Sequence, residues 1–366
     1  MPRERVPMGA LHETSKRGED SMKAKTIPVL AGLMIALFAG CKEDEATASV
    51  TPTPQGYPIG PIVVWNYVSD HYFVDTLYRG TFENYYGADP PVLSPDIQVV
   101  DEEVWVQKFP PFGTRTGVAF ITLPPRPPQG YDPALRNLES IPGERESAPF
   151  ARLNREEYDV WGDGYVGVIS LRVPTFENQV VGVAYRRRDG TQFGEFAGDV
   201  PDTSTVIVLK MLKPRFLNLV GPVYRVAWNQ LLKNVYPVGG RRIKEYGFSL
   251  DITYGSTPGE SQSLIMNQPL LRVLGLDRYT QDGTPALNGD GLFDFRPGIT
   301  IDQDRGELIL PSLRPFDEGI RKYFTDRGLP VPDSTYFNPW IYDSTRAFAQ
   351  ARVGKTYSFN GRTFTY

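Results

Sequence analysis

The chain has 366 residues, of which 40% are hydrophobic and 22% are charged, and its formal net charge is -4. This composition excludes a disordered chain, and the slightly acidic balance offers no basic surface for nucleic acid. The aromatic share of 12%, with 35 Gly and 33 Pro, favours strands joined by turns over helical bundles. We therefore expect a mainly β (α+β) protein, an antiparallel β-sandwich-like domain with a few short helices.

The N-terminal region has the features of an export signal. A basic start at Met22 is followed by an apolar run, Ile27–Phe38, and by Ala39-Gly40 before Cys41. The ending resembles a bacterial lipobox, in which the cysteine is acylated, and Cys41 is the single cysteine of the chain. We expect that translation starts at Met22 and that residues 1–21 come from a start codon assigned too far upstream. Residues 22–40 are expected to be a lipoprotein signal peptide, and Cys41 is expected to be lipidated. The alternative for the apolar run is a buried helix.

A tether is expected from Cys41 to Pro61. It begins with Lys42, Glu43, Asp44 and Glu45, and continues with small residues and Pro. The acidic run is either an ordinary solvated segment or a surface-export signal, because it resembles the Lys-then-acidic signal of lipoproteins in Bacteroidota-type bacteria.

Residues 62–255 are expected to form a β-rich domain. The Pro-rich stretch Pro124–Arg152 reads as a surface loop, and Thr114–Gly117 as a turn between two paired strands. A stripe of apolar residues at helical spacing predicts a helix over Val223–Val235. Period-2 patterns predict strands around Val104–Val106 and Val118–Phe120, at Tyr165–Val173 and Val180–Arg187 with a turn at Glu177-Asn178, at Val206–Met211, and at the edge strand Tyr246–Tyr254.

Residues 256–366 are expected to form a second segment of hairpins and short helices. Within Leu270–Phe316, Leu292–Phe295 reads as one strand, and a turn at Asp304-Arg305-Gly306 joins two more. Further on, the patterns predict a helix over Phe316–Phe324, a helix over Thr345–Arg352 capped by Asp343-Ser344, and a hairpin around Asn360-Gly361.

The order of residues in Leu276–Phe316 resembles the repeated soluble domain of the SprA/Sov family, the outer-membrane translocons of type IX secretion that are also needed for gliding motility. The motif residues are Asp277, Arg278, Asp290, Gly291, Phe293, Asp294, Phe295, Pro297, Gly298, Gly306, Pro311, Pro315 and Phe316. The chain departs from the family pattern at Glu307, where a basic residue is usual, at Arg314, where an acidic one is, and at Asp317, where Gly is.

This resemblance implies a non-enzymatic outer-membrane or surface lipoprotein that belongs to, or assists, the secretion and gliding machinery. Its partners would be other proteins of that machinery, with the membrane reached through the lipid. The chain would be either a stand-alone tethered module or the front piece of a longer translocon. The alternative is a surface lipoprotein that binds glycan or another extracellular ligand through a β-sandwich face with exposed aromatic side chains.

Few residues point to chemistry. Asn288, Asp290 and Asp294 are a weak calcium candidate, since oxygen ligands alternate around a Gly, and the competing reading is a turn with self-capping side chains. His71 is the single histidine after the export signal, and we expect it in a polar loop. The pair Glu156-Glu157 reads as surface. We therefore expect no catalytic residues, no cofactor and no metal beyond the calcium candidate.

Overall fold

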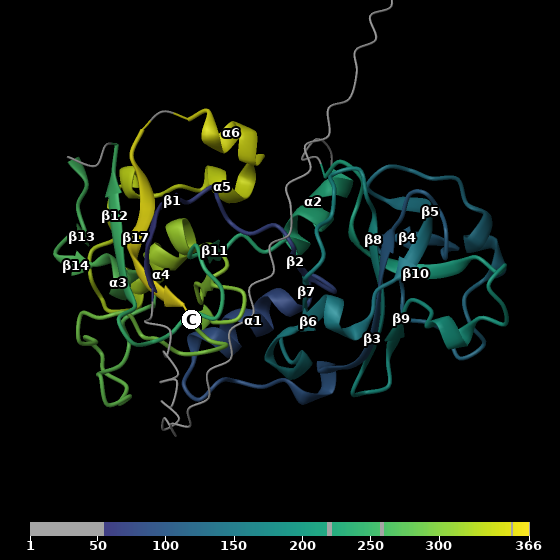
Figure 1. Ribbon diagram of the computed structural model, residues 1–366, viewed down its shortest axis with the longest axis horizontal. Helices are drawn as coiled ribbons and strands as arrows, with labels where there is room; N and C mark the ends of the chain where they lie inside the picture. The colour runs from purple at the N-terminus through teal and green to yellow at the C-terminus, as the bar shows by residue number, and fades with distance from the viewer. Residues whose placement is uncertain (1–54, 218–221, 257–259, 353, 366) are drawn as a thin grey trace, which may run out of the picture. The chain divides into compact units, whose positions relative to one another are not determined.

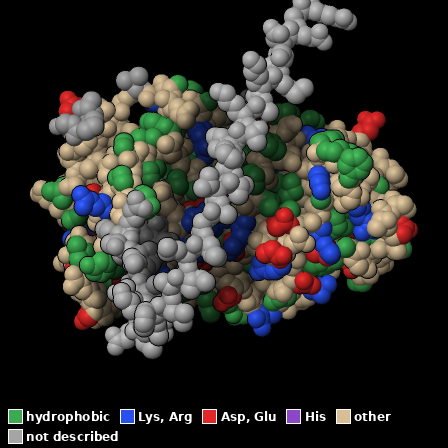
Figure 2. Space-filling model, in the orientation of Figure 1, with side chains coloured by type: hydrophobic (Ala, Val, Ile, Leu, Met, Phe, Trp, Pro, Cys, Tyr) green, Lys and Arg blue, Asp and Glu red, His purple; other side chains and the backbone are tan. Residues whose placement is uncertain are grey.

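The computed structural model describes residues 55–217, 222–256, 260–352 and 354–365, which form several small β-sheets and a few short helices (Figure 1). The expectation of a mainly β, α+β fold is confirmed. On the face shown in Figure 2, acidic and basic side chains are intermixed over the described surface.

The largest sheet has the strand order β10-β4-β5-β3-β8-β9, and β10 also pairs with β8. Five of its strands therefore close into a ring. The pairing of β10 with β4 is parallel, and the others are antiparallel. The strands are β3 (Val99–Gln107), β4 (Arg115–Phe120), β5 (Arg145–Arg152), β8 (Val181–Arg187), β9 (Gln192–Phe193) and β10 (Ile207–Lys213).

Strand β5 corrects two expectations. It lies inside the stretch predicted as a surface loop, and it separates β3 from β4, which were expected to pair through a turn at Thr114–Gly117. Glu146, Ala148 and Phe150 are buried at every second position, but the charge of Glu146 hid the alternation. Pro149 fits because its carbonyl accepts a hydrogen bond from the N–H of Lys108 (3.0 Å) and it needs no donor there.

A three-stranded sheet, β2-β7-β6, packs beside helix α1 (Tyr78–Gly87). Its strands are β2 (His71–Phe73), β6 (Tyr158–Val160) and β7 (Val168–Leu171). The strands predicted on either side of Glu177-Asn178 are confirmed as β7 and β8. They belong to different sheets, however, so this turn joins no hairpin.

The sheet β1-β17-β12 contains β1 (Gln55–Val63), β17 (Thr356–Thr365) and β12 (Ser249–Gly255). Figure 1 shows yellow β17 between β1 and green β12. The predicted hairpin around Asn360-Gly361 is wrong, because both residues lie inside the continuous strand β17. Gly361 is paired on both sides, with Ile59 and Leu250, and a Cβ there would collide with the carbonyl of Ser249. The predicted edge strand is confirmed as β12.

The third small sheet carries the predicted hairpin. Strands β15 (Ile301–Asp302) and β16 (Glu307–Ile309) pair antiparallel around the expected turn, and β11 (Val235–Pro237) pairs with β16. Leu292–Phe295 is not a strand, since it has no ladder partner. Helix α2 (Pro222–Gln230) ends before its predicted limit because the chain turns into β11.

Short elements complete the fold. The helix predicted over Phe316–Phe324 is confirmed as a π-helical turn, Pro315–Gly319, followed by α4 (Ile320–Asp326). Helix α6 (Arg346–Gln350) is capped by the Thr345 hydroxyl, which accepts from the N–H of Phe348 (3.3 Å), and not by Asp343-Ser344. The remaining elements are β13 (Leu264–Ile265), β14 (Gln268–Pro269), α3 (Leu270–Val273) and α5 (Trp340–Asp343).

The largest hydrophobic core draws on the whole described chain. It includes Ile59 from the end of the expected tether, Tyr236 from the first expected segment, and Phe316 and Phe359 from the second. The tether expectation is therefore wrong from Gln55 onward, because β1 begins there and its Ile59 is buried. The ring of Phe316 stacks on Tyr357 at 4.9 Å, and Tyr236 contacts both Phe316 and Phe359. Residues 62–255 and 256–365 therefore share one core and one sheet.

Candidate functional site

Asp277 organises the loop of the family motif. Its side chain is almost fully buried, and one carboxylate oxygen accepts hydrogen bonds from the N–H groups of Asp290 (2.8 Å) and Gly291 (3.2 Å). The other oxygen accepts from the Arg272 guanidinium (3.1 Å). Gly289 passes so close that a Cβ there would collide with the carboxylate. Asp277 thus fixes the turn that precedes the Phe293–Phe295 segment.

Asp294 ties the far end of this loop to its start. Its carboxylate accepts from the N–H groups of Arg278 (2.5 Å) and Tyr279 (3.3 Å), and its own N–H donates to the carbonyl of Leu276 (2.9 Å). Burial raises the pKa of Asp294 to about 6, although the two N–H groups act in the opposite direction. The motif acids therefore shape the backbone.

The calcium candidates do not form a ligand cage. Asp290 accepts from the N–H of Leu292 (2.9 Å), and Asp294 is bonded to two backbone donors. Among the described residues, the histidine and acidic side chains whose ligand atoms converge are elsewhere, at Asp70, His71 and Glu307. The loop has the self-capping Asx geometry that was the alternative to a metal site.

We expect no calcium binding at this loop, because the ion would have to replace hydrogen bonds that hold the backbone. Isothermal titration of the purified chain with millimolar calcium should give no saturable heat, and the melting temperature should match that in a chelator. A saturable heat that disappears in Asp290→Asn would contradict this expectation.

The remaining motif residues are spread between the interior and the surface. Arg278 reaches α1, where its guanidinium donates to the carbonyls of Tyr86 (3.3 Å) and Gly87 (2.9 Å). Pro315 and Phe316 are buried, and Pro311 is partly buried. Pro297 and Gly298 lie exposed in the turn before β15. The motif therefore joins a buried frame to a limited exposed surface.

Gly306 is required by the turn between β15 and β16. Its φ of +69° is left-handed, and a Cβ would collide with the carbonyl of Gly240. We expect Gly306→Ala to lower the free energy of unfolding by about 2–4 kcal/mol, through backbone strain and the displaced neighbour. Gly298→Ala is the matched control, because its φ is +72° but no atom lies within 4 Å of the added methyl. Gly298→Ala should lower the free energy of unfolding by only about 1 kcal/mol. Urea denaturation of both variants measures the two losses, and equal losses would contradict the collision at Gly306.

The three departures from the family pattern are all in ion pairs. Arg314 contacts Asp317 (2.8 Å) and, through two nitrogens, Asp343 (2.9 and 3.0 Å). Two of the departures, Arg314 and Asp317, therefore pair with each other. Glu307 pairs with Arg305 at 2.9 Å. The unusual charges in the motif are thus compensated inside this chain.

His71 corrects an expectation, because it is fully buried at the start of β2 and not in a polar loop. Its Nε2 lies 3.3 Å from Asp70 Oδ1 and 3.2 Å from Glu307 Oε2, while Nδ1 contacts the Ser170 hydroxyl. Arg305 donates to both Asp70 (3.0 Å) and Glu307 (2.9 Å). The signal missed in the sequence is that His71 is followed by Tyr72 and Phe73, with which it forms a buried strand.

The His71 cluster has the side-chain types of a hydrolase triad or a metal site but fits neither. Ser170 is fully buried in the middle of β7, so a substrate cannot reach its hydroxyl. The Arg305 guanidinium lies on the same two carboxylates that a metal ion would need. The cluster is therefore an internal ion network that joins β2 to the β15–β16 hairpin. Glu156 is exposed, and Glu157 caps the turn at Asn154, as the surface reading expects.

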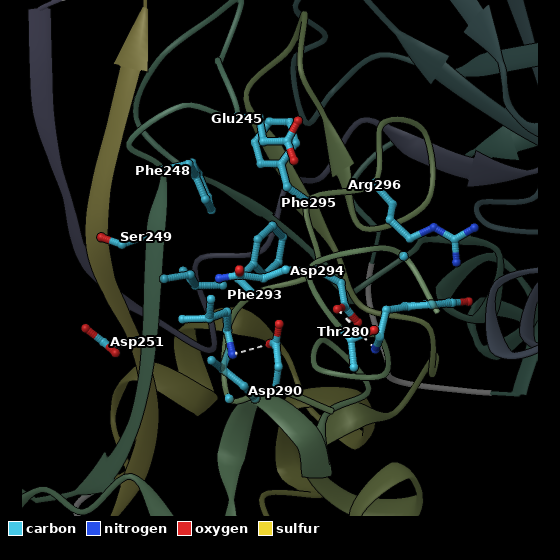
Figure 3. Close-up of a pocket in the computed structure, with 17 residues that line it drawn as sticks. Glu245, Phe248, Ser249, Asp251, Thr280, Asp290, Phe293, Asp294, Phe295 and Arg296 are labelled. Carbon is cyan, nitrogen blue, oxygen red and sulfur yellow. Dashed lines mark hydrogen bonds between the residues drawn. The ribbon is translucent and has the colours of Figure 1, made fainter. Parts of the chain in front are cut away.

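One candidate binding site is a groove beside β12, of about 760 Å³. Figure 3 shows the rings of Phe248, Phe293 and Phe295 turned toward one another in this groove. Their centroids are 5.1–6.3 Å apart. Arg296 lies over the ring of Tyr279 at 4.2 Å. Two of these aromatic residues, Phe293 and Phe295, belong to the family motif, and we refer to this site as the β12 groove.

The lipidation site Cys41 and the export residues Lys42, Glu43, Asp44 and Glu45 lie outside the described residues, as do residues 1–40. In the part of the chain that the structure describes, no helix combines the length and the apolar character needed to cross a membrane.

Comparisons with known proteins provide no further assignment. No protein-family model matches the chain, and no curated protein matches it significantly.

Proposed function

We propose that this chain is a non-enzymatic component or accessory of a type IX secretion and gliding machinery, and that it acts through protein contacts. The proposal rests on the ordered resemblance of Leu276–Phe316 to the SprA/Sov domain. It includes attachment to the outer membrane, on the cell surface, through acylated Cys41.

The observation that carries the proposal is that residues of the motif fix the backbone conformation of the motif itself. Asp277 and Asp294 bond backbone N–H groups within the motif, and Gly306 permits a turn that no other residue fits without strain. Such residues specify a shape, so their shared order is best explained by a shared fold. The motif residues Asp290, Gly291, Phe293, Asp294 and Phe295 line the β12 groove, which is a surface suited to a partner.

A non-enzymatic role is supported by the buried state of the His71 cluster. The Ser170 hydroxyl contacts His71, and the carboxylates of Asp70 and Glu307 pair with Arg305. Ser170 is fully buried, so a substrate cannot reach it. The β12 groove contains carboxylates but no histidine, cysteine or lysine. Its aromatic rings and carboxylates support recognition of a partner.

Deleting the gene and measuring secreted cargo tests the proposal. We expect secretion and gliding to fall and to be restored by the wild-type gene, whereas Asp277→Ala, which damages the motif loop, should restore neither. Undiminished secretion together with lost adhesion to glycan would reject the secretion role and favour a glycan-binding lipoprotein.

Acylation is tested separately with a palmitate analogue in growing cells. We expect label in the wild-type chain and none in Cys41→Ser. Label that persists in Cys41→Ser would refute the lipid anchor without affecting the proposed protein contacts.

A further inference from the structure

The β12 groove adjoins the outer edge of a β-sheet. β12 is an edge strand, and among the described residues its ladder neighbour in its sheet is β17. Figure 3 shows Phe248, Phe293 and Phe295 on the side of β12 away from β17, and the side chains of Ser249 and Asp251 on the β17 side. Ser249, Leu250 and Asp251 of β12 line the groove. A partner in the groove would therefore lie alongside a strand.

The outer edge of β12 still has unpaired backbone groups. Tyr254 exchanges two hydrogen bonds with Gln262 on this side (2.9 and 3.0 Å). Alternate residues of a strand present their N–H and C=O groups to the same edge, so Leu250 and Ile252 present theirs there too. Neither has a hydrogen-bond partner at this edge among the described residues. An extended chain can bond to such an edge by strand addition.

The charges that line the groove have one predominant sign. Glu245, Asp251, Asp290 and Asp294 contribute four carboxylates, against the single guanidinium of Arg296. That guanidinium extends away from the three Phe rings in Figure 3, where it lies on the ring of Tyr279 and 3.8 Å from Asp89. A cationic partner complements this lining, and the rings of Phe248, Phe293 and Phe295 offer it an apolar contact.

We propose that the β12 groove docks an extended, basic peptide segment of a partner protein, which adds to the edge of β12. Separate Lys or Arg side chains of that segment pair with Glu245 and with Asp251, which lie apart in Figure 3, and an apolar side chain packs on Phe248, Phe293 and Phe295. This inference deepens the proposed function, on whose protein contacts it rests, and it names the chemistry of the partner.

The test measures binding of fluorescein-labelled Lys-Phe-Lys-Phe-Lys and Glu-Phe-Glu-Phe-Glu peptides to the full chain by fluorescence anisotropy. The double variant Glu245→Gln/Asp251→Asn removes two exposed charges whose carboxylates make no hydrogen bond with a described residue. Glu139→Gln/Glu156→Gln is the matched control, because it removes the same charge from exposed sites outside the groove.

We expect the basic peptide to bind at least about tenfold more tightly than the acidic one, and the double variant to weaken it about tenfold while the control leaves it unchanged. N-methylation of alternate residues of the basic peptide should abolish binding, because it blocks the ladder hydrogen bonds. Equal binding of both peptides, unchanged binding in Glu245→Gln/Asp251→Asn, or full binding of the N-methylated peptide would each overturn the proposal.

A soluble oligosaccharide serves as the competing probe. Binding of the oligosaccharide with no binding of the basic peptide would overturn the proposal in favour of a glycan site. The outcome is independent of the secretion assay: peptide binding with normal secretion in the deletion strain rejects the secretion role alone, and impaired secretion without peptide binding rejects the groove alone.

Discussion

Replacing Asp277 by Ala is expected to lower the free energy of unfolding by about 3–5 kcal/mol. The substitution leaves the N–H groups of Asp290 and Gly291 without their acceptor and the partly buried Arg272 without its counter-ion. Urea denaturation followed by circular dichroism measures the loss. Because the same loop carries Phe293 and Phe295, peptide binding at the β12 groove should fall as well.

Asp282→Ala is the control for this prediction. Asp282 also accepts from nearby groups, Thr280 and the N–H of Thr284, but it is exposed at the tip of its turn. Its loss should cost much less stability than the loss of Asp277, because water replaces these hydrogen bonds at an exposed site. If Asp277→Ala were no more harmful than Asp282→Ala, the motif loop would not depend on the buried carboxylate.

Replacing Arg305 by Ala should cost a similar amount, about 3–5 kcal/mol, because Asp70 and Glu307 would then face each other and His71 without a compensating guanidinium. Arg172→Ala is the matched control. Arg172 forms a two-point pair with Asp159 (2.7 Å each), but its side chain is 48% exposed, so removing it should cost about 0–1 kcal/mol. Equal costs would show that burial does not set the strength of these pairs.

The same network should make stability sensitive to acid. Burial alone would raise the pKa of Glu307, but the adjacent His71 and Arg305 outweigh it and lower the pKa below its usual value. The contribution of Glu307 is therefore fully present above the carboxyl pKa of the unfolded chain and is lost as the pH falls through the lower, folded value. Between roughly pH 5 and pH 3, wild type should lose more stability than Glu307→Gln. The free energy of unfolding of both proteins is measured by urea denaturation at these pH values. An equal decrease in wild type and Glu307→Gln would contradict the prediction.

Most regular strands could be predicted from the sequence because alternation of apolar side chains is a local signal. Strand β5 was missed because its buried face includes Glu146, whose carboxylate is satisfied by the N–H groups of Gly143 (3.1 Å) and Arg215 (3.2 Å). The middle strand β17 was missed because Asn360-Gly361 is a strong local turn signal, which pairing on both sides overrides. In both strands, contacts with residues far away in the sequence override the local pattern.

The candidate site was predictable only in part. Of the motif residues named from the sequence, Asp290, Gly291, Phe293, Asp294 and Phe295 lie together in one groove. Their order gives no hint that Asp277 and Asp294 bond backbone groups. The place of His71 could not be predicted, because Glu307 and Arg305 are more than 200 positions away. The β12 groove likewise combines Phe248 with Phe293 and Phe295 only after folding.

The central position of β17 has a consequence for assembly. It joins residues that are roughly 300 positions apart, such as Gln55 and Thr365, so the loop that must close is very long. Until residues 356–365 arrive, β1 and β12 have no common neighbour, and both are open to pairing with other chains. Slow, late completion of this sheet would therefore leave both strand edges exposed for much of folding.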